Sequence, residues 1–341
     1  MGGNGATSWG QALRRRWPWR RRARGFAAGV TLGSPSEMPG VQIGGYPLVR
    51  TFAHGALGEL HLASDPDTGA PLAIKTVRLH GGELTRERFL RESHAAARLR
   101  HPNIVQCHAT GIEGHGEEAV GWIAMEWIAG SDLARYTCTA RLLPEPLVLQ
   151  LMADAAEALS HAHRHGVVHR DIKPANLLFN PANGRLKVAD FGCAHLTDAE
   201  RSRSGVLAGT PVYMAPEQLA GAPVDGRCDL YALGVVLFEL LTGRLPFEAG
   251  SMGELLRAIT SEPPPSLQRL RPDLPVALDE LLAHLLAKPP GDRPADGDAV
   301  ARELRHVAAA LEPTLVSPGA PASTAAGTMA EPLCPTPPTL P

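Results

Sequence analysis

Three side chains in the stretch Val168–Asn176 have the types and the spacing for phosphoryl-transfer chemistry. Asp171 supplies a carboxylate, Lys173 a cation two residues later and Asn176 an amide five residues later. A carboxylate can accept the proton of a hydroxyl group, a cation can neutralise a phosphoryl group in transit, and an amide oxygen can bind a divalent metal. The spacing predicts that these groups converge on one loop.

A second carboxylate with metal-binding character is Asp190, in the sequence Asp190-Phe191-Gly192. A hard oxygen ligand beside a glycine suits Mg²⁺, which uses few protein carboxylates together with phosphate oxygens. We therefore predict that Asp190 and Asn176 hold a divalent metal.

Lys75 ends the strand-like run Ala73-Ile74-Lys75 and allows two interpretations. It is a charge at the edge of a strand, or it reaches phosphate oxygens near the glycine-containing turn that precedes it. Glu92 follows in a predicted helix and can hold the Lys75 side chain in place.

That turn reads Ala53-His54-Gly55-Ala56-Leu57-Gly58-Glu59-Leu60. Glycines allow a backbone to approach phosphate oxygens closely and to present N–H groups to them. Taken alone, the stretch favours an ordinary β-hairpin, and only its neighbours favour phosphate binding.

The elements that must position these groups are predicted as strands first and helices afterwards. Turns with Gly, Asp and Pro separate the first β-prone runs, and the pattern becomes mostly helical from residue 145 onward. This order is typical of an α+β fold in two lobes. The predicted strands are 48–52, 59–63, 71–77, 104–107 and 121–127; the predicted helices are 85–99, 146–164, 227–242, 252–259, 276–287 and 295–311.

The charge distribution separates the ends of the chain from its body. Lys and Arg total 33 and Asp and Glu 35, for a net charge of −2, which argues against a uniformly basic nucleic-acid binder. Residues 1–45 are predicted to be a disordered basic tail, whose Arg cluster offers a weak contact to an anionic surface. Residues 311–341 are rich in Pro, Ala and Thr and are predicted to be disordered as well.

The cysteines and histidines favour neither a disulfide framework nor a metal site. Five widely spaced cysteines without a C-x-x-C pair predict a reducing, cytoplasmic environment. His161, His163 and His165 alternate along a predicted helix, where residues two apart face different directions. The apolar stretch Leu230–Leu241 is too short for a membrane span, so no transmembrane segment is predicted.

Four motifs in a fixed order resemble the catalytic domain of eukaryotic-type Ser/Thr protein kinases, in particular the bacterial branch. They are the Ala-Ile-Lys strand, the catalytic loop around Asp171, the Asp-Phe-Gly sequence and Ala215-Pro216-Glu217, together with the run His101-Pro102-Asn103-Ile104-Val105. The resemblance covers residues 46–310. It implies a two-lobed kinase fold with a small, mainly β N-lobe (46–127) that carries one helix and a larger, mainly helical C-lobe (128–310).

The resemblance implies ATP and Mg²⁺ as cofactors and a role for each matching residue. Lys75 pairs with phosphates and with Glu92, Asp171 accepts the hydroxyl proton, and Asn176 and Asp190 hold magnesium. The expected nucleotide site further includes Ala53, Gly55, Gly58, Leu60, Ala73, the gatekeeper Met125, the hinge Glu126–Ile128, Asp132 near the ribose, and Leu178.

Further positions imply structure, regulation and substrate class. Glu217 and Arg293 are expected to form a buried ion pair, and Asp229 to brace the catalytic loop. Lys173 and Thr210 match kinases that act on serine and threonine of protein substrates. Arg170 implies control by a phosphate on the activation segment, and the candidate phosphosites there are Thr197, Ser202 and Ser204.

Two other functions are compatible with parts of this pattern. A pseudokinase or scaffold would bind ATP with weak activity or none, but Lys75, Asp171, Asn176 and Asp190 are all present. A small-molecule phosphotransferase would share the catalytic loop but lack the Ala-Pro-Glu segment and the Arg293 partner. One departure from the family pattern is Ala53, which stands where the glycine loop begins with Gly.

Overall fold

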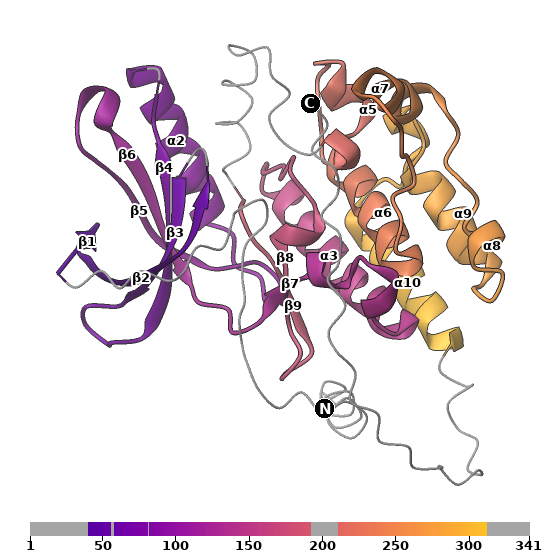
Figure 1. The fold of residues 1–341 in the computed structure, drawn as a ribbon, viewed down its shortest axis with the longest axis horizontal. Helices are drawn as coiled ribbons and strands as arrows, with labels where there is room; N and C mark the ends of the chain where they lie inside the picture. Colours follow the sequence, from indigo (N-terminus) through magenta and orange to yellow (C-terminus); the bar gives the residue numbers. More distant parts are fainter. Residues whose placement is uncertain (1–39, 56–57, 81, 192–210, 312–341) are drawn as a thin grey trace, which may run out of the picture. The chain divides into compact units, whose positions relative to one another are not determined.

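The computed structural model describes residues 40–55, 58–80, 82–191 and 211–311 (Figure 1). These residues fall into two compact units. The first unit comprises the described residues of Met1–Ala134 and Glu157–Thr210. The second unit comprises the described residues of Arg135–Ala156 and Pro211–Pro341. The α+β prediction is confirmed, because among the described residues most strands precede residue 130 and most helices follow it.

The first unit is built on a six-stranded antiparallel sheet in the order β1-β2-β3-β4-β6-β5. Strand β4 shows why these segments form strands: its β-branched and apolar residues are buried along nearly its whole length. The bounds are β1 Gln42–Ile43, β2 Tyr46–Gly55, β3 Gly58–Ser64, β4 Pro71–Arg78, β5 Cys107–Glu113 and β6 Val120–Glu126.

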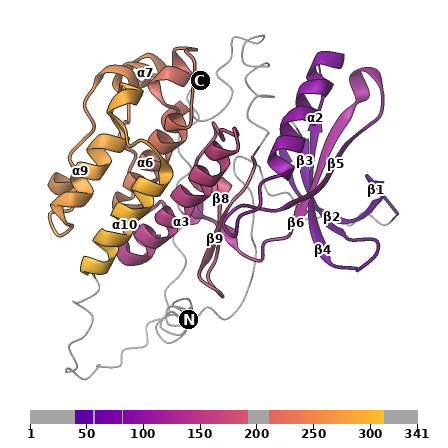
Figure 2. The ribbon, with the colours of Figure 1, turned by 180° about the vertical axis from the view of Figure 1, so that it is seen from behind.

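Helix α2, Glu83–Ala97, packs against β5 and β6 and is seen beside the sheet in both ribbon views (Figures 1 and 2). Its Phe89 is fully buried in a core cluster with Val77 and Ile123. Gly121 of β6 makes room for it, since a Cβ at that position would lie 2.6 Å from the Phe89 ring. The size of the Phe89 side chain and the absence of one at Gly121 together determine how closely α2 approaches the sheet.

A second, three-stranded sheet completes the first unit. Its order is β7-β8-β9, with β7 at Ser131–Asp132, β8 at Leu177–Asn180 and β9 at Arg185–Val188. The predicted strand 104–107 is wrong in extent, because Ile104 makes only an isolated bridge to Val188 and β5 begins at Cys107. In the segment before β5, Asn103 and Val105 bond to Val188 of β9, and Gln106 bonds to the large sheet, at Glu126 of β6.

The second unit is helical and is organised around α6, Arg227–Thr242. Residues Cys228–Leu241 of this helix are all buried, as expected for a helix surrounded by others. It ends at Gly243, whose φ of 71° provides the left-handed cap. The other helices are α3 Glu145–Arg164, which contributes to both units, α5 Pro216–Leu219, α7 Met252–Ser261, α8 Leu267–Leu270, α9 Val276–Leu285 and α10 Gly297–Leu311.

Among the described residues, none of the helices combines the length and the apolar character that a bilayer crossing requires.

Candidate active site

The loop before β8 is folded around a buried histidine. His169 has no exposed surface, and its Nε2 lies 2.7 Å from the carbonyl oxygen of Ala189. Its Nδ1 accepts the backbone N–H of Asp171 at 3.2 Å. The same ring makes an edge contact with Phe191 at 4.7 Å between centroids. His169 therefore joins the loop of Asp171 to the segment of Asp190.

The Asp171 carboxylate is held from two sides. Lys173 Nζ lies 2.8 Å from Asp171 Oδ2, and Asn176 Nδ2 donates to the Asp171 carbonyl at 2.7 Å and to Oδ2 at 3.2 Å. The Asp171 side chain is 38% exposed, so it is accessible from solvent. The predicted convergence of Asp171, Lys173 and Asn176 is thus present in the structure.

Lys75 and Asp190 form an ion pair in the first unit. The Lys75 ammonium lies 2.8 Å from Asp190 Oδ2, and both side chains are partly buried. Burial raises the pKa of the Asp190 carboxyl, but the charge and hydrogen bond of Lys75, with His169 and Lys173, outweigh it and leave the pKa below its ordinary value. The pair with Lys75 therefore favours the ionised form of Asp190, which is the form that a metal ligand requires.

The donor set around Asn176 and Asp190 fits a hard divalent cation. Asn176 is buried and its Nδ2 is used by Asp171, so its Oδ1 is the atom left to act as a ligand. Its backbone oxygen accepts the N–H of Ala189 at 2.9 Å, next to Asp190. An amide oxygen and an ionised carboxylate are ligands that Mg²⁺ prefers.

The predicted nucleotide-site residues of the large sheet lie in one region because of strand register. Ala53 pairs with Leu60 across β2 and β3, and Ala73 pairs with Met125 across β4 and β6. Leu60 is in turn the partner of Lys75. The register places small and apolar side chains next to Lys75, and their role in binding a nucleotide stays a prediction.

Gly55 and Gly58 close the hairpin of the predicted glycine loop as a register pair. At Gly58 a Cβ would lie 1.8 Å from the Thr76 carbonyl oxygen, so only glycine fits there. In the small sheet, Asp132 pairs with Leu178, and both are buried.

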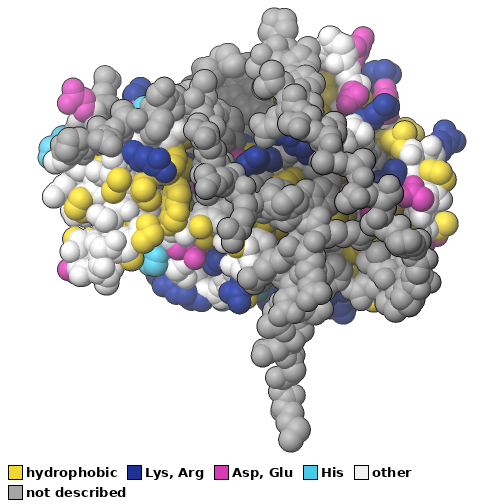
Figure 3. All heavy atoms as spheres, turned by 60° about the horizontal axis from the view of Figure 1, so that its bottom comes forward, with side chains coloured by type: hydrophobic (Ala, Val, Ile, Leu, Met, Phe, Trp, Pro, Cys, Tyr) yellow, Lys and Arg dark blue, Asp and Glu magenta, His cyan; other side chains and the backbone are white. Residues whose placement is uncertain are grey.

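An aromatic stack next to the hinge was missed by the sequence reasoning. Phe52 of β2 stacks on Trp127 at 4.9 Å between ring centroids, and the Arg50 guanidinium lies 4.4 Å above the Phe52 ring. Figure 3 shows hydrophobic side chains gathered next to basic ones at the left of the view. Trp127 lies between Glu126 and Ile128, so Phe52 packs against the predicted hinge. The feature of the sequence that could have predicted this stack is the aromatic residue Phe52, directly before Ala53.

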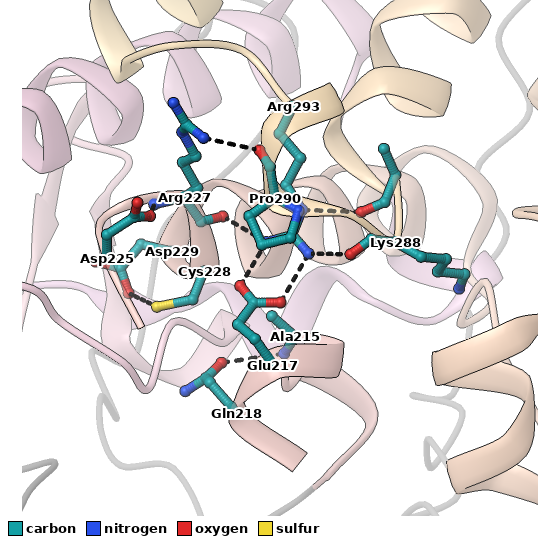
Figure 4. A network of polar contacts seen from close by, with 11 residues as sticks. Ala215, Glu217, Gln218, Asp225, Arg227, Cys228, Asp229, Lys288, Pro290 and Arg293 are labelled. Carbon is teal, nitrogen blue, oxygen red and sulfur yellow. Dashed lines mark hydrogen bonds and ion pairs between the residues drawn. The ribbon is translucent and has the colours of Figure 1, made fainter. Parts of the chain in front are cut away.

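The predicted Glu217–Arg293 ion pair is present in the second unit (Figure 4). The Arg293 guanidinium contacts both carboxylate oxygens, at 2.6 and 2.8 Å, and its side chain is fully buried. It also donates to three backbone carbonyls, those of Ala287, Lys288 and Arg227. Asp229 is buried and accepts a weak bond from the Cys228 thiol, at 3.7 Å.

The contacts described above do not test the predicted roles of several other site residues. Thr197, Ser202, Ser204 and Thr210 lie outside the described residues. Glu92 lies half-buried on α2, and its pairing with Lys75 stays a prediction, as does the bracing role of Asp229.

Arg170 has a φ of 64° and Asp190 a φ of 67°, a left-handed backbone that non-glycine residues adopt at a cost.

Three histidine rings form a column beside α3. His161 lies 4.4 Å from His165 and 5.2 Å from His101, measured between ring centroids. His165 directly follows α3, and its Nδ1 lies 2.8 Å from the carbonyl oxygen of His161, four residues earlier. In the part of the chain that the structure describes, no group of three or more His, Cys, Asp or Glu has metal-binding geometry.

Comparison with known proteins gives one consistent result. The family model described as "Protein kinase domain" matches residues 46–306. The chain is 38% identical over 275 residues to serine/threonine-protein kinase pkn3 of Myxococcus xanthus, covering 77% of this chain and 50% of that protein. It is 39% identical over 279 residues to serine/threonine-protein kinase PknJ of Mycobacterium tuberculosis, covering 78% and 45%.

Solved structures agree with these relatives. The kinase domain of PknI from Mycobacterium tuberculosis aligns with a TM-score of 0.63 and 33% identity, covering 80% of this chain and 100% of that domain. The chain spans about half the length of the curated relatives it matches.

Proposed function

The chain belongs to the protein kinase family, and on that premise we propose that it transfers the γ-phosphate of ATP to serine and threonine side chains of proteins. The observation that carries the proposal is the Asp171 carboxylate, oriented by Lys173 and Asn176 and accessible from solvent. The relatives are named as Ser/Thr kinases, which supports the same acceptor class here.

Each group in the first unit has one task in the proposed reaction. Asp171 accepts the proton of the acceptor hydroxyl, and Lys173, held beside it, neutralises charge on the phosphoryl group in transit. Lys75 binds phosphate oxygens of the nucleotide, and its pair with Asp190 keeps both charged groups in position. Protein kinases use ATP, and bound Mg²⁺ at Asn176 and Asp190 would neutralise charge on its phosphates.

Regulation by phosphorylation of the activation segment is part of the proposal. Arg170 adjoins Asp171, and a phosphate on Thr197, Ser202 or Ser204 would supply the anion that an arginine binds. Phosphatase treatment of the purified protein is then expected to lower its activity. Full activity of the triple alanine variant of these three positions would rule this regulation out.

The remaining parts of the chain have proposed roles outside the catalytic reaction. We assign residues 46–310 to the kinase domain and propose that the reaction does not need residues 1–39 and 312–341. The predicted tails 1–45 and 311–341 are too long, because β1 at Gln42–Ile43 pairs with β2 and α10 extends to Leu311. The Arg cluster of the first tail offers a weak contact to an anionic surface, and no specific nucleic acid is expected to bind. The wide spacing of the five cysteines and the lack of a C-x-x-C pair support a reducing, cytoplasmic environment.

The test compares Asp171→Asn with a matched control, Asp67→Asn. Asp67 is an exposed carboxylate in the β3–β4 turn of the same unit. Asp171→Asn is expected to lower kcat by about 100- to 10,000-fold and to leave the affinity for ADP unchanged, because the carboxylate acts on the acceptor hydroxyl. Asp67→Asn is expected to behave like the unaltered protein. Intact turnover in Asp171→Asn would refute the assignment.

A further inference from the structure

The segment before β5 connects the hinge to the strand that leads to Asp190. Val188 of β9 donates its N–H to the Asn103 carbonyl at 2.8 Å and accepts from Val105 N at 2.9 Å. On the other side, Glu126 N donates to the Gln106 carbonyl at 2.9 Å. One short stretch of backbone, 103–106, therefore lies between the end of β6 and strand β9, all within the first unit.

Lys187 closes this arrangement with its side chain. Its ammonium lies 2.5 Å from Glu126 Oε1 and donates to the Ile104 carbonyl at 3.2 Å. Glu126 Oε1 also accepts the Gln106 N–H at 2.7 Å. The carboxylate of the first hinge residue is thus held by a cation from β9 and by a backbone donor from the segment between them.

The Lys187–Glu126 ion pair is largely buried, so its loss is expected to affect the structure around it. The Lys187 and Glu126 side chains are 20% and 27% exposed, so both charges are largely shielded from water. Removing the cation would leave the Glu126 carboxylate partly buried without its ionic partner, which costs more than losing an exposed pair. The expected response is a shift of the hinge backbone toward solvent.

We propose that Lys187 is a positioning residue for the nucleotide, which fixes the hinge at Glu126 relative to the strand that carries Asp190. The inference rests on the proposed function, in which the hinge holds the adenine ring and Asp190 holds the metal at the phosphates. Lys187 lies three residues before Asp190 and in register with Leu178, the expected floor of the adenine site. The ion pair thus couples the two ends of the nucleotide site through one strand.

The experiment measures ADP binding in the presence of Mg²⁺ by calorimetry, together with kcat and KM for ATP. Lys187→Met is expected to raise the ADP Kd and the KM for ATP by about 10-fold, equal to about 1.4 kcal/mol, with kcat changed less than about 3-fold. Arg185→Met is the matched control, because Arg185 is an exposed cation on the same strand. Lys187→Arg, which keeps the charge, is expected to restore most of the affinity.

A double-mutant cycle separates positioning from general destabilisation. Glu126→Gln is expected to weaken ADP binding as Lys187→Met does, and the Lys187→Met and Glu126→Gln double variant is expected to bind no more weakly than either. Unchanged or tighter ADP binding in Lys187→Met, or additive losses in the double variant, would overturn the inference. The binding measurement does not need phosphate transfer, so it gives an answer even if the proposed function fails.

Discussion

At the level of single residues, Ala53 is the position where the chain departs from the glycine-rich loop of its family. The side chain is fully buried and Ala53 pairs with Leu60 within the β2–β3 hairpin. An extended strand backbone accommodates any L-residue, so the methyl group does not force a strained conformation. Gly58, where a Cβ would clash with the Thr76 carbonyl oxygen, is present, and so is Gly55.

Ala53→Gly is therefore expected to change the KM for ATP by less than about 10-fold and to change kcat little. It should also lower the free energy of unfolding by about 0.5–1 kcal/mol, because glycine loses more backbone entropy in a strand. Steady-state kinetics and urea unfolding measure the two effects. A gain in activity of about 100-fold would mean that the natural loop is defective, and the pseudokinase alternative would then be preferred.

At the level of elements, the column of His101, His161 and His165 links the loop after α2 to the end of α3. Burial, then the charges of His161, Arg164 and Lys187, lower the pKa of His101 against the opposing effect of Glu157. Burial, then His165 and Arg164, lower the pKa of His161. Both rings thus resist protonation in the folded protein more than in the unfolded chain.

The sign of the pH effect follows from this difference. Near and below the ordinary histidine pKa of 6.5 the unfolded chain binds more protons than the folded one, so stability is present above that pH and is lost as pH falls. The Tm is expected to decrease between pH 7.5 and 5.5, and His161→Gln should reduce that decrease by a few degrees. His94→Gln, an exposed histidine on α2, is the control. An equal pH response in His161→Gln and the unaltered protein would contradict the prediction.

The Arg293–Glu217 pair gives a second prediction at this level, for the second unit. Arg293→Met removes the cation from a buried carboxylate and leaves three backbone carbonyls without their donor. The expected cost is about 3–5 kcal/mol in the free energy of unfolding. Arg257→Met, which breaks the exposed Arg257–Glu262 pair, should cost at most about 1 kcal/mol in the same urea titration. Similar losses in the two variants would refute a structural role for Arg293.

At the level of the whole molecule, the features that depend on local sequence patterns were predicted better than those that depend on contacts between distant segments. Helix α6 was placed at its exact bounds because an apolar run ends at Gly243, a strong local stop signal. Asp171, Asn176 and Asp190 could be singled out because their types and spacing are local features of the sequence, and their roles stay predictions.

Contacts between distant segments were not predictable in the same way. Ile104 read as part of a strand, but its neighbours bond to β9, more than 80 residues later in the chain. Lys187 and Phe52 were missed for the same reason, since their importance depends on Glu126 and Trp127. Periodicity detects burial along one element and says nothing of which distant residue meets it.

Deletion of residues 1–39 tests the assignment of function to the described fold. Every catalytic group that we propose lies between Lys75 and Asp190, so the shortened protein should keep its kcat and KM for ATP. Binding of the full chain to anionic vesicles, if it depends on the Arg cluster, should be lost on deletion and should weaken with salt. A large loss of kcat after deletion would place part of the active site in the first tail.

The most direct test of the central claim is to locate transferred phosphate by mass spectrometry after incubation with ATP and Mg²⁺. The unaltered protein is expected to place phosphate on serine and threonine residues, of itself and of an added protein substrate. Asp171→Asn, treated identically, should place almost none. Phosphate found only on tyrosine, or equal incorporation by the two proteins, would contradict a Ser/Thr kinase that depends on Asp171.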